Sequence, residues 1–306
     1  MGLPLSVITC SHNPRPHYLT EVLDALRAQT LNRQDWEYLL VDNASDQPLD
    51  SRVDLGWHPN SRHVREDNLG LTLARLRAIR EAAGQILVFV DDDNLLDSDY
   101  LEQVGQLAHA WPMLGAFGGQ VRPRFEKTPP DWTRQYWSRL VIREFDHDLW
   151  SNAFDFHKTM PSGAGLCVRH RVADQYLTYH ENGKRSLLMD RTGESLLSGG
   201  DTDLASTACD VGLGTGLFAS LRLTHLIPAE RVEEEYLVRL VEGMAFSGVV
   251  VSSFRSSERL RTRIPWKTRM ANSLRSMFMD RRGRRFFRAV RRGEESAAEF
   301  LEQRSR

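Results

Sequence analysis

A short apolar run that ends in three consecutive carboxylates constrains this chain more than any other segment. Residues 86–90 read Ile-Leu-Val-Phe-Val, a composition typical of a strand buried on both faces, and Asp91, Asp92, Asp93 and Asn94 follow at once. Like charges this close repel, and burying even one of them is costly, so folding alone does not favour them there. A divalent cation would offset the repulsion, because Mg²⁺ and Mn²⁺ bind carboxylate oxygens. A solvated acidic turn is the alternative interpretation.

Strands and helices are expected to alternate along the first 110 residues. Continuous apolar runs predict the strands, and apolar residues three and four positions apart predict the helices. Gly84 stands where the second of these helices would stop. Alternation of this kind is typical of a mainly parallel sheet with helices on both faces. The expected order is strand 5–9, helix 18–29, strand 37–41, a short strand near 63–64, helix 71–83, strand 86–90 and helix 98–110.

Polar clusters follow three of these strands, at residues 10–15, 42–46 and 91–94. In parallel sheets, ligands bind beyond the carboxyl ends of the strands. The three clusters therefore predict one site built from separate parts of the chain. After residue 120 the pattern is less regular: residues 122–156 are rich in proline and aromatic residues, and clearer elements return as strand 162–168, helix 204–211 and strand 221–227.

The length of 306 residues allows one large α/β domain, alone or with an appendage. Cys10, Cys167 and Cys209 are far apart and odd in number, so neither a zinc site nor a disulfide framework is expected. The N-terminus lacks the pattern of a secretory signal, and no run of about 20 apolar residues suggests a membrane span. These features predict a cytoplasmic protein.

The net charge of −1 conceals a basic segment. Residues 255–292 contain fourteen Lys and Arg against Glu258 and Asp280, a charge of +12, so the rest of the chain carries −13. Apolar residues at helical spacing within 266–278 and 284–290 predict amphipathic helices, which can lie on an anionic membrane surface. Packing against the acidic body and a solvated extension are the alternatives. No nucleic-acid-binding motif accompanies the arginines, so no nucleic acid is expected as a partner.

Several motifs of this chain occur in the order seen in family 2 glycosyltransferases, which have the GT-A fold and use nucleotide sugars. The resemblance covers about Leu3 to Leu240. It departs from the family at Gly200-Asp201, where many members have Glu-Asp. The motifs are Val41–Asp46, Asn68–Gly70 with Ala74-Arg75, Val90–Asn94, Ser162–Gly165, Leu197–Asp203 and Leu223–Ala229.

The resemblance implies a GT-A domain of the α/β class over residues 1–240, with a mainly parallel central sheet flanked by helices. Residues 1–120 would form the nucleotide-sugar half and residues 121–240 the acceptor half. Residues 241–306 would then be a basic helical C-terminal extension.

The resemblance also implies roles for individual residues. Asp201 would be the catalytic base, with Asp203 in reserve, and Asp93 and His225 would hold Mn²⁺ or Mg²⁺. Ordinary structural roles are the alternatives: a turn cap for Asp42, a surface cation for Arg75, an N-cap for Asp201, and packing for His225 and the aromatic residues. The nucleotide-sugar residues would be Thr9, Cys10, Ser11, Asn13, Asp42, Asn68, Arg75, Asp91 and Asp92, and the acceptor residues Trp132, Trp137 and Gly163.

The implied function is an inverting, metal-dependent transfer of a hexose-type sugar. The donor would be a UDP, GDP or dTDP sugar, and the acceptor a hydroxyl of a glycan or glycolipid, as in cell-surface polysaccharide assembly. The enzyme would be cytoplasmic, with peripheral contact to the inner face of the membrane. A family member that binds nucleotide sugars without transferring them is the main alternative, motivated by Gly200. A prenyl-diphosphate enzyme also uses an acidic metal cluster, but that chemistry is usually built on a helical bundle, which the β-rich pattern disfavours. A nucleotidyltransferase shares the acidic metal site, but the glycine-rich loop with a basic residue expected near its N-terminus is absent from this sequence.

Overall fold

The computed structural model describes residues 4–154, 157–185, 199–255 and 278–304. It divides into two compact units. The first comprises Met1–Gly183 and Gly200–Ala229, and the second comprises Lys184–Gly199 and Glu230–Arg306.

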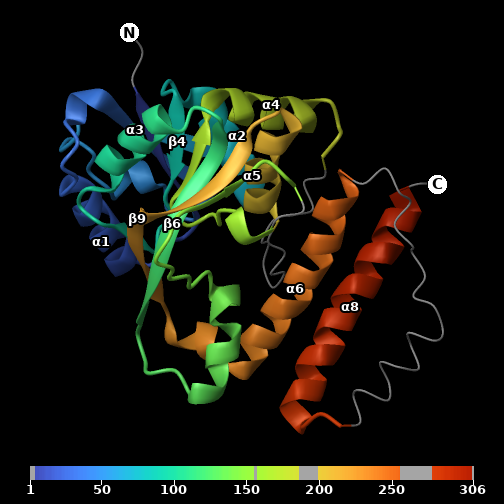
Figure 1. Cartoon of the computed structure of the whole chain (residues 1–306). Helices are drawn as coiled ribbons and strands as arrows, with labels where there is room; N and C mark the ends of the chain where they lie inside the picture. The colour runs from blue at the N-terminus through green and yellow to red at the C-terminus, as the bar shows by residue number, and fades with distance from the viewer. Residues whose placement is uncertain (1–3, 155–156, 186–198, 256–277, 305–306) are drawn as a thin grey trace. The chain divides into compact units, whose positions relative to one another are not determined.

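The first unit is built on one twisted sheet (Figure 1). Its strands lie in the order β3-β2-β1-β4-β8-β6-β9-β5, and β7 pairs with β9. The strands are β1 Leu5–Ser11, β2 Trp36–Asn43, β3 Ser61–Glu66, β4 Ile86–Phe89, β5 Asn94–Leu96, β6 Leu114–Phe125, β7 Leu149–Ser151, β8 Leu166–Arg169 and β9 Gly214–Ile227.

Strands β1 to β4 pair in parallel, as the alternating pattern predicts. The loops that follow β1, β2 and β4 therefore meet at one edge of the sheet. Beyond β4 the sheet is mixed: β8 is antiparallel to both β4 and β6, and β5 and β7 are antiparallel to β9. The predicted parallel arrangement thus describes the half of the sheet that carries the acidic triplet.

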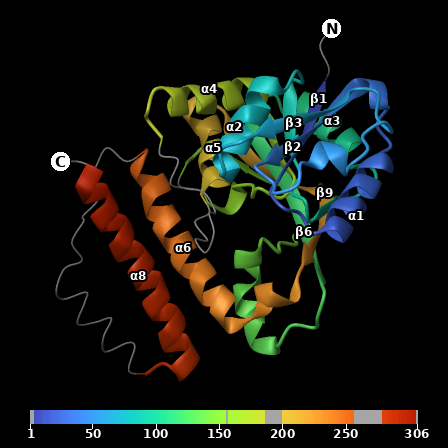
Figure 2. The same cartoon turned by 180° about the vertical axis from the view of Figure 1, so that it is seen from behind.

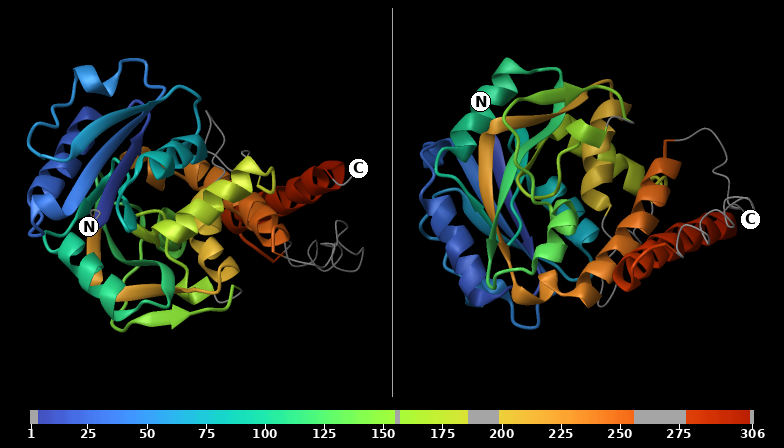
Figure 3. Two further views of the ribbon diagram at one scale, coloured as in Figure 1. Left: turned by 90° about the horizontal axis from the view of Figure 1, so that it is seen from above. Right: turned by 60° about the horizontal axis from the view of Figure 1, so that its bottom comes forward.

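Helices cover both faces of the sheet (Figures 2 and 3). Helices α1 and α3 pack on one face, with Val7 and Val88, and helices α2, α4 and α5 pack on the other, with Ile8 and Phe89. Successive residues of each central strand are therefore buried on opposite faces, which explains the continuous apolar runs. The helices are α1 Pro16–Arg27, α2 Leu71–Glu81, α3 Tyr100–Ala110, α4 His170–Glu181 and α5 Gly200–Asp210.

Gly84 does not stop a helix, contrary to the prediction. Helix α2 ends at Glu81, and the chain is already extended at Ala82. A Cβ on Gly84 would stand 2.4 Å from backbone atoms of both Leu5 and Ser6 on β1. A glycine is therefore needed there because two backbones approach closely.

Strand β6 was not predicted, because its composition is unusual for a strand. It contains Gly118, Gly119 and Pro123, which are uncommon within strands. Its register with β9 shifts between Gly119 and Gln120, where a Cβ on Gly119 would stand 2.0 Å from the carbonyl oxygen of Leu221. Beyond β6, the aromatic-rich segment forms a 3₁₀ helix, η3, over Asp131–Leu140.

The second unit contains two long helices, α6 (Glu234–Ser253) and α8 (Arg281–Arg304), which lie side by side. Val250 and Val251 of α6 pack with Ala297 of α8. The helix predicted within 284–290 is part of α8, whereas the one predicted within 266–278 lies outside the described residues, apart from its last residue.

Helix α6 is long and apolar enough to cross a membrane by length and composition alone. Its first turn carries Glu234 and Glu235, and part of its apolar surface packs against α8. A core helix of a soluble protein meets the same criterion, so α6 is weak evidence for a span.

Candidate functional site

The acidic triplet Asp91–Asp93 lies just beyond β4, and its three side chains diverge. The first carboxylate lies 3.9 Å from the guanidinium of Arg75 on α2. The second accepts a hydrogen bond from the hydroxyl of Ser11 on β1. The third faces His225 on β9. Each negative charge therefore meets a different partner, and the mutual repulsion expected from the sequence is reduced.

Asp93 and His225 meet because β5 and β9 are paired, with Asn94 directly opposite His225. Their Oδ2 and Nε2 atoms are 3.4 Å apart, and both side chains are nearly buried. Nδ1 of His225 lies 3.1 Å from the carbonyl oxygen of Leu140, which can only accept a hydrogen bond. Nδ1 therefore donates a hydrogen bond to this carbonyl, which fixes the ring so that Nε2 faces the carboxylate of Asp93.

This pair suits a divalent cation. A carboxylate oxygen and an imidazole nitrogen are both ligands of Mn²⁺, and the carbonyl of Leu140 fixes the ring as outer partners of metal ligands do. No group of three or more His, Cys, Asp and Glu that could hold a metal occurs among the described residues. The residues present fit a site in which the protein supplies few ligands and substrate phosphates or water supply the rest.

Asp201 lies in the first turn of α5, close to Gly163. Its Oδ2 accepts the backbone N–H of Gly163 at 2.8 Å, and its Oδ1 accepts that of Thr202 at 2.8 Å. A Cβ on Gly163 would stand 3.0 Å from Nη2 of Arg75 and 3.1 Å from Oδ2 of Asp201. The absence of a side chain at residue 163 thus lets the cation and the carboxylate flank the same small space.

Arg75 is almost fully buried, with 5% of its surface exposed. Burial lowers the pKa of its guanidinium, but the negative charges of Asp91 and Asp201 outweigh this and hold that pKa above its usual value. Arg75 therefore remains a cation between the acidic triplet and Asp201. The surface-cation alternative for this residue is wrong, because α2 turns it toward the sheet.

Gly200, where the chain departs from the family, is buried against α2. A Cβ at this position would stand 3.0 Å from the hydroxyl oxygen of Thr72. A larger side chain would need Thr72 to shift, which gives the glycine a packing reason.

The loops after β1 and β2 are bonded to each other. The backbone N–H of Asn13 donates to the hydroxyl of Ser45, and the side-chain oxygen of Asn13 accepts the N–H of Asp46, both at 3.0 Å. Asn13 and Ala44 have φ values of 47° and 54°, the left-handed region that asparagine tolerates better than most residues. The two polar clusters thus form one connected rim.

Asp42 is buried at the end of β2, and its carboxylate organises the loop that follows. It accepts the backbone N–H groups of Ser45 and Leu49 at 3.0 Å each, and a side-chain hydrogen bond from Arg65. Burial raises the pKa of Asp42, but these hydrogen bonds outweigh it and hold the pKa below its ordinary value. Arg65, directly opposite on β3, was not identified from the sequence. The predicted contact of Asp42 with a nucleotide base stays a prediction.

Asn43 is a second organising residue that sequence reasoning missed. Its side-chain amide donates to the carbonyl of Asn68 at 2.7 Å and accepts the N–H of Gly70 at 2.8 Å. Gly70 has φ 153°, a conformation that favours glycine. The side chain of Asn68 itself donates to Glu66 at 2.9 Å.

Thr9 and Cys10 line the end of β1 below this rim. Thr9 is buried and Cys10 is half-buried. Burial raises the pKa of the Cys10 thiol to about 12, with Arg75 lowering it and Asp91 and Asp92 raising it. Cys10 is therefore a neutral thiol at physiological pH.

The aromatic residues predicted to bind an acceptor lie on η3. Trp137 packs against Phe125, with ring centroids 5.1 Å apart, and its indole N–H donates to Thr133 at 3.1 Å. Trp132 is half-buried beside Tyr136. The carbonyl that orients His225 belongs to the last residue of η3, so this segment reaches the Asp93–His225 pair.

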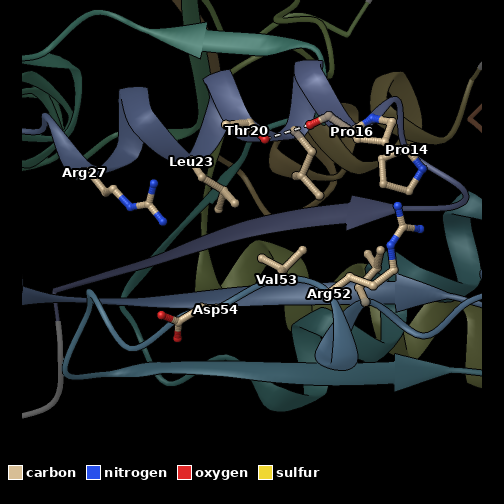
Figure 4. A pocket seen from close by; sticks show the side chains of 10 residues that line it. Pro14, Pro16, Thr20, Leu23, Arg27, Arg52, Val53 and Asp54 are labelled. Carbon is tan, nitrogen blue, oxygen red and sulfur yellow. Dashed lines mark hydrogen bonds between the residues drawn. The ribbon is translucent and has the colours of Figure 1, made fainter.

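A groove of about 210 Å³ lies between α1 and the segment that follows β2 (Figure 4). Leu23, Thr20 and Arg27 face it from α1, and Arg52 and Val53 face it from the other side. Its lining begins at Pro14 beside the β1 loop and includes neither the acidic triplet nor Asp201. The candidate site therefore lies outside this groove.

Comparison with known proteins is consistent with this arrangement. The family described as "Glycosyl transferase family 2" matches residues 6–164. An uncharacterized protein, y4gI of Sinorhizobium fredii (strain NBRC 101917 / NGR234), is 34% identical over 115 residues. That match covers 36% of this chain but only 12% of the relative, so the chain spans a small part of the relative's length.

Solved structures share the fold at low sequence identity. S. aureus TarS 1-349 in complex with UDP-GlcNAc aligns with a TM-score of 0.54 and 12% identity, covering 98% of this chain and 91% of that one. GalNAc-T7 with UDP, GalNAc and Mn²⁺ aligns with a TM-score of 0.52 and 14% identity, covering 83% of this chain and 51% of that one. Together with the matched family and the strand-end site, these findings show that the chain is a member of glycosyl transferase family 2 with the GT-A fold.

Proposed function

We propose that the protein transfers a hexose-type sugar from a nucleoside diphosphate to a hydroxyl of a glycan or glycolipid, with inversion and with a divalent cation. The observation that carries this proposal is the placement of two acidic centres on different elements. Asp93 faces His225 at the end of the sheet, whereas Asp201 stands at the start of α5. The similar TarS structure is a complex with UDP-GlcNAc, and the similar GalNAc-T7 structure contains UDP, GalNAc and Mn²⁺. A UDP sugar is therefore the first donor to test.

The donor half would use the rim formed by the β1 and β2 loops. Thr9 and Ser11 lie on β1 and Asn13 in the loop after it. Asp42 lies near the end of β2, and Asn68 follows β3. These groups would hold the nucleoside, with the diphosphate directed toward the acidic triplet. A cation held by Asp93 and His225 would stabilise the negative charge that develops on the leaving diphosphate.

Asp201 would act as the general base. The acceptor hydroxyl must lose its proton as it attacks, and a carboxylate within about 3 Å of it can accept that proton. Two backbone N–H groups orient the Asp201 carboxylate without neutralising it. Inversion requires the base to lie across the sugar from the leaving group, which suits a base on α5 and a leaving group near β4.

A nucleotide-sugar-binding protein without transferase activity is the competing proposal, and Gly200 motivates it. The packing of Gly200 against Thr72 removes part of that motive, because the glycine has a local structural reason. Release of the sugar from a bound nucleotide sugar separates the two proposals. Binding without any turnover on a panel of glycan and glycolipid acceptors would favour the binding protein.

The first experiment is a calorimetric titration of the full chain with UDP, GDP, dTDP and CDP, with and without Mn²⁺ or Mg²⁺. We expect one nucleotide to bind selectively and only with metal present. Asp93→Asn should abolish this metal-dependent binding, because it removes the charged ligand opposite His225. Asp24→Asn, which changes an exposed carboxylate on α1, is the matched control and should bind like wild type. Unchanged Mn²⁺-dependent affinity in Asp93→Asn would exclude the metal assignment.

We also propose a cytoplasmic location with peripheral membrane contact through α8. Arg281, Arg284 and Arg288 recur at helical spacing near its N-terminus, and Phe278 just before it is 91% exposed. Basic side chains near an anionic surface each contribute about 1 kcal/mol of attraction. Flotation should therefore show binding to vesicles with anionic lipid but not to neutral ones. Equal recovery on both would contradict the proposal.

A further inference from the structure

A buried arginine lies between the two acidic centres of the site. Arg75 projects from α2 toward the sheet, where burial of an uncompensated charge would be costly. A guanidinium cannot lose its proton in a protein, so its charge must be balanced by neighbouring anions. Asp91, 3.9 Å away, is one of them, and Asp201 is the other.

The first turn of α5 lies close to this guanidinium. The space beside Gly163 is bounded at 3.0 Å by Nη2 of Arg75 and at 3.1 Å by Oδ2 of Asp201. The space beside Gly200 is bounded at 3.8 Å by Nη1 of the same arginine. Glycines on both sides therefore leave Arg75 close to the turn that carries Asp201.

The backbone groups that hydrogen-bond to Asp201 orient its carboxylate but do not balance its charge. The N–H groups of Gly163 and Thr202 are neutral donors, one to each oxygen. The fixed charge of the buried Arg75 adds an attraction that acts over several ångströms. The same guanidinium lies 3.9 Å from the carboxylate of Asp91, so its charge attracts both the base and the first residue of the acidic triplet.

We propose that Arg75 is a positioning residue that holds Asp201 in its reactive orientation. This inference rests on the proposed function, because it assigns Asp201 the role of base. It differs from the role that the family resemblance implies for Arg75, which is contact with the donor nucleotide sugar. A donor-contacting arginine lowers nucleotide affinity when removed, whereas a positioning arginine lowers turnover and leaves that affinity in place.

The test uses Arg75→Met, which keeps an unbranched side chain but removes the charge, and Arg75→Lys, which keeps the charge. UDP affinity is measured by calorimetry with Mn²⁺, and kcat and KM are measured from UDP release on transfer from UDP-GlcNAc to water. For Arg75→Met we expect kcat to fall about 100-fold, the scale of a misplaced catalytic group, with UDP affinity and KM within about threefold of wild type. Arg75→Lys should recover part of kcat.

Arg77→Met is the matched control. Arg77 lies on the same helix, is 43% exposed and pairs with Glu81, so its loss should change neither affinity nor kcat. Arg75→Ala adds a second readout, because guanidinium ion at millimolar concentration can occupy the vacated space and restore turnover. Thermal denaturation of each variant identifies any that does not fold, and the lysine variant and the rescue then carry the test.

Three outcomes would overturn the proposal. UDP affinity and turnover that fall together more than about tenfold in Arg75→Met would show that Arg75 binds the donor. Turnover near the wild-type value in a folded Arg75→Met would show that Asp201 needs no such partner. A wild-type protein that binds no nucleotide would refute the proposed function first, and the role of Arg75 with it.

Discussion

Gly163→Ala tests the geometry of the base without removing any charge. The new methyl group would stand 3.0 Å from Nη2 of Arg75 and 3.1 Å from Oδ2 of Asp201. Contacts this short are tighter than nearly all real Cβ contacts, so either group must move by a few tenths of an ångström. Gly163 has no left-handed φ, so alanine fits its backbone and the effect comes from the side chain.

The magnitudes separate activity from stability. A displacement of 1 Å at a catalytic group costs about 100-fold in rate, so a few tenths of an ångström should lower kcat by about threefold to tenfold. Weakening the hydrogen bond from residue 163 to Asp201 costs about 1 kcal/mol, because its acceptor is charged. Replacing glycine by alanine returns about 0.4–1 kcal/mol by restricting the unfolded chain. The free energy of unfolding should therefore change little while kcat falls.

The assay compares UDP release from UDP-GlcNAc with thermal unfolding of the same samples. Gly105→Ala is the control, because Gly105 is an exposed position of α3 where a Cβ would meet nothing within 4 Å. It should raise stability by about 1 kcal/mol, the helix preference of alanine over glycine, and leave kcat unchanged. If Gly163→Ala retains kcat within twofold of wild type, the close packing around Asp201 has no catalytic consequence and the reasoning fails.

Two further predictions concern single carboxylates. Asp201→Asn should keep UDP affinity and lower turnover by about 100-fold or more, the usual contribution of a general base, whereas normal turnover would place the base elsewhere. Asp42 has a folded-state pKa below its ordinary value, so its contribution to stability is present above the unfolded pKa of about 4 and is lost as pH falls through the folded value. Urea unfolding between pH 3 and 7 should therefore show a smaller loss of stability on acidification in Asp42→Asn than in wild type. Equal losses would contradict the role of Asp42 as a charged anchor of its loop.

The predicted fold relied on signals that lie within short segments. The runs that became β1, β2 and β4 and the periodicity that became α2 are local, so the sequence was sufficient for them. Strand β6 was missed because its glycines and proline accommodate a bulge and a close approach of β9, which are properties of the neighbouring strand. Helix α6 was not predicted either, and part of its apolar surface packs against α8, a later segment of the chain.

The order of motifs was sufficient to predict the family, and the matching of residues 6–164 confirms it. Roles within the site remain predictions, although the structure brings several of the named residues together. Asp93 meets His225, and Asp201 meets Gly163. Arg65 escaped notice because nothing in its own segment indicates that β3 places it opposite Asp42.

The sequence by itself determined that a buried strand ends in three carboxylates, because strand periodicity and adjacency are written in consecutive residues. Only the tertiary structure decided which partner each carboxylate meets. Arg75, Ser11 and His225 come from distant parts of the chain, and strand pairing and helix packing bring them to one edge. The orientation of the His225 ring is likewise set by a carbonyl at the end of η3. Charge placement in this site is thus a long-range property, since it depends on contacts that no local pattern encodes.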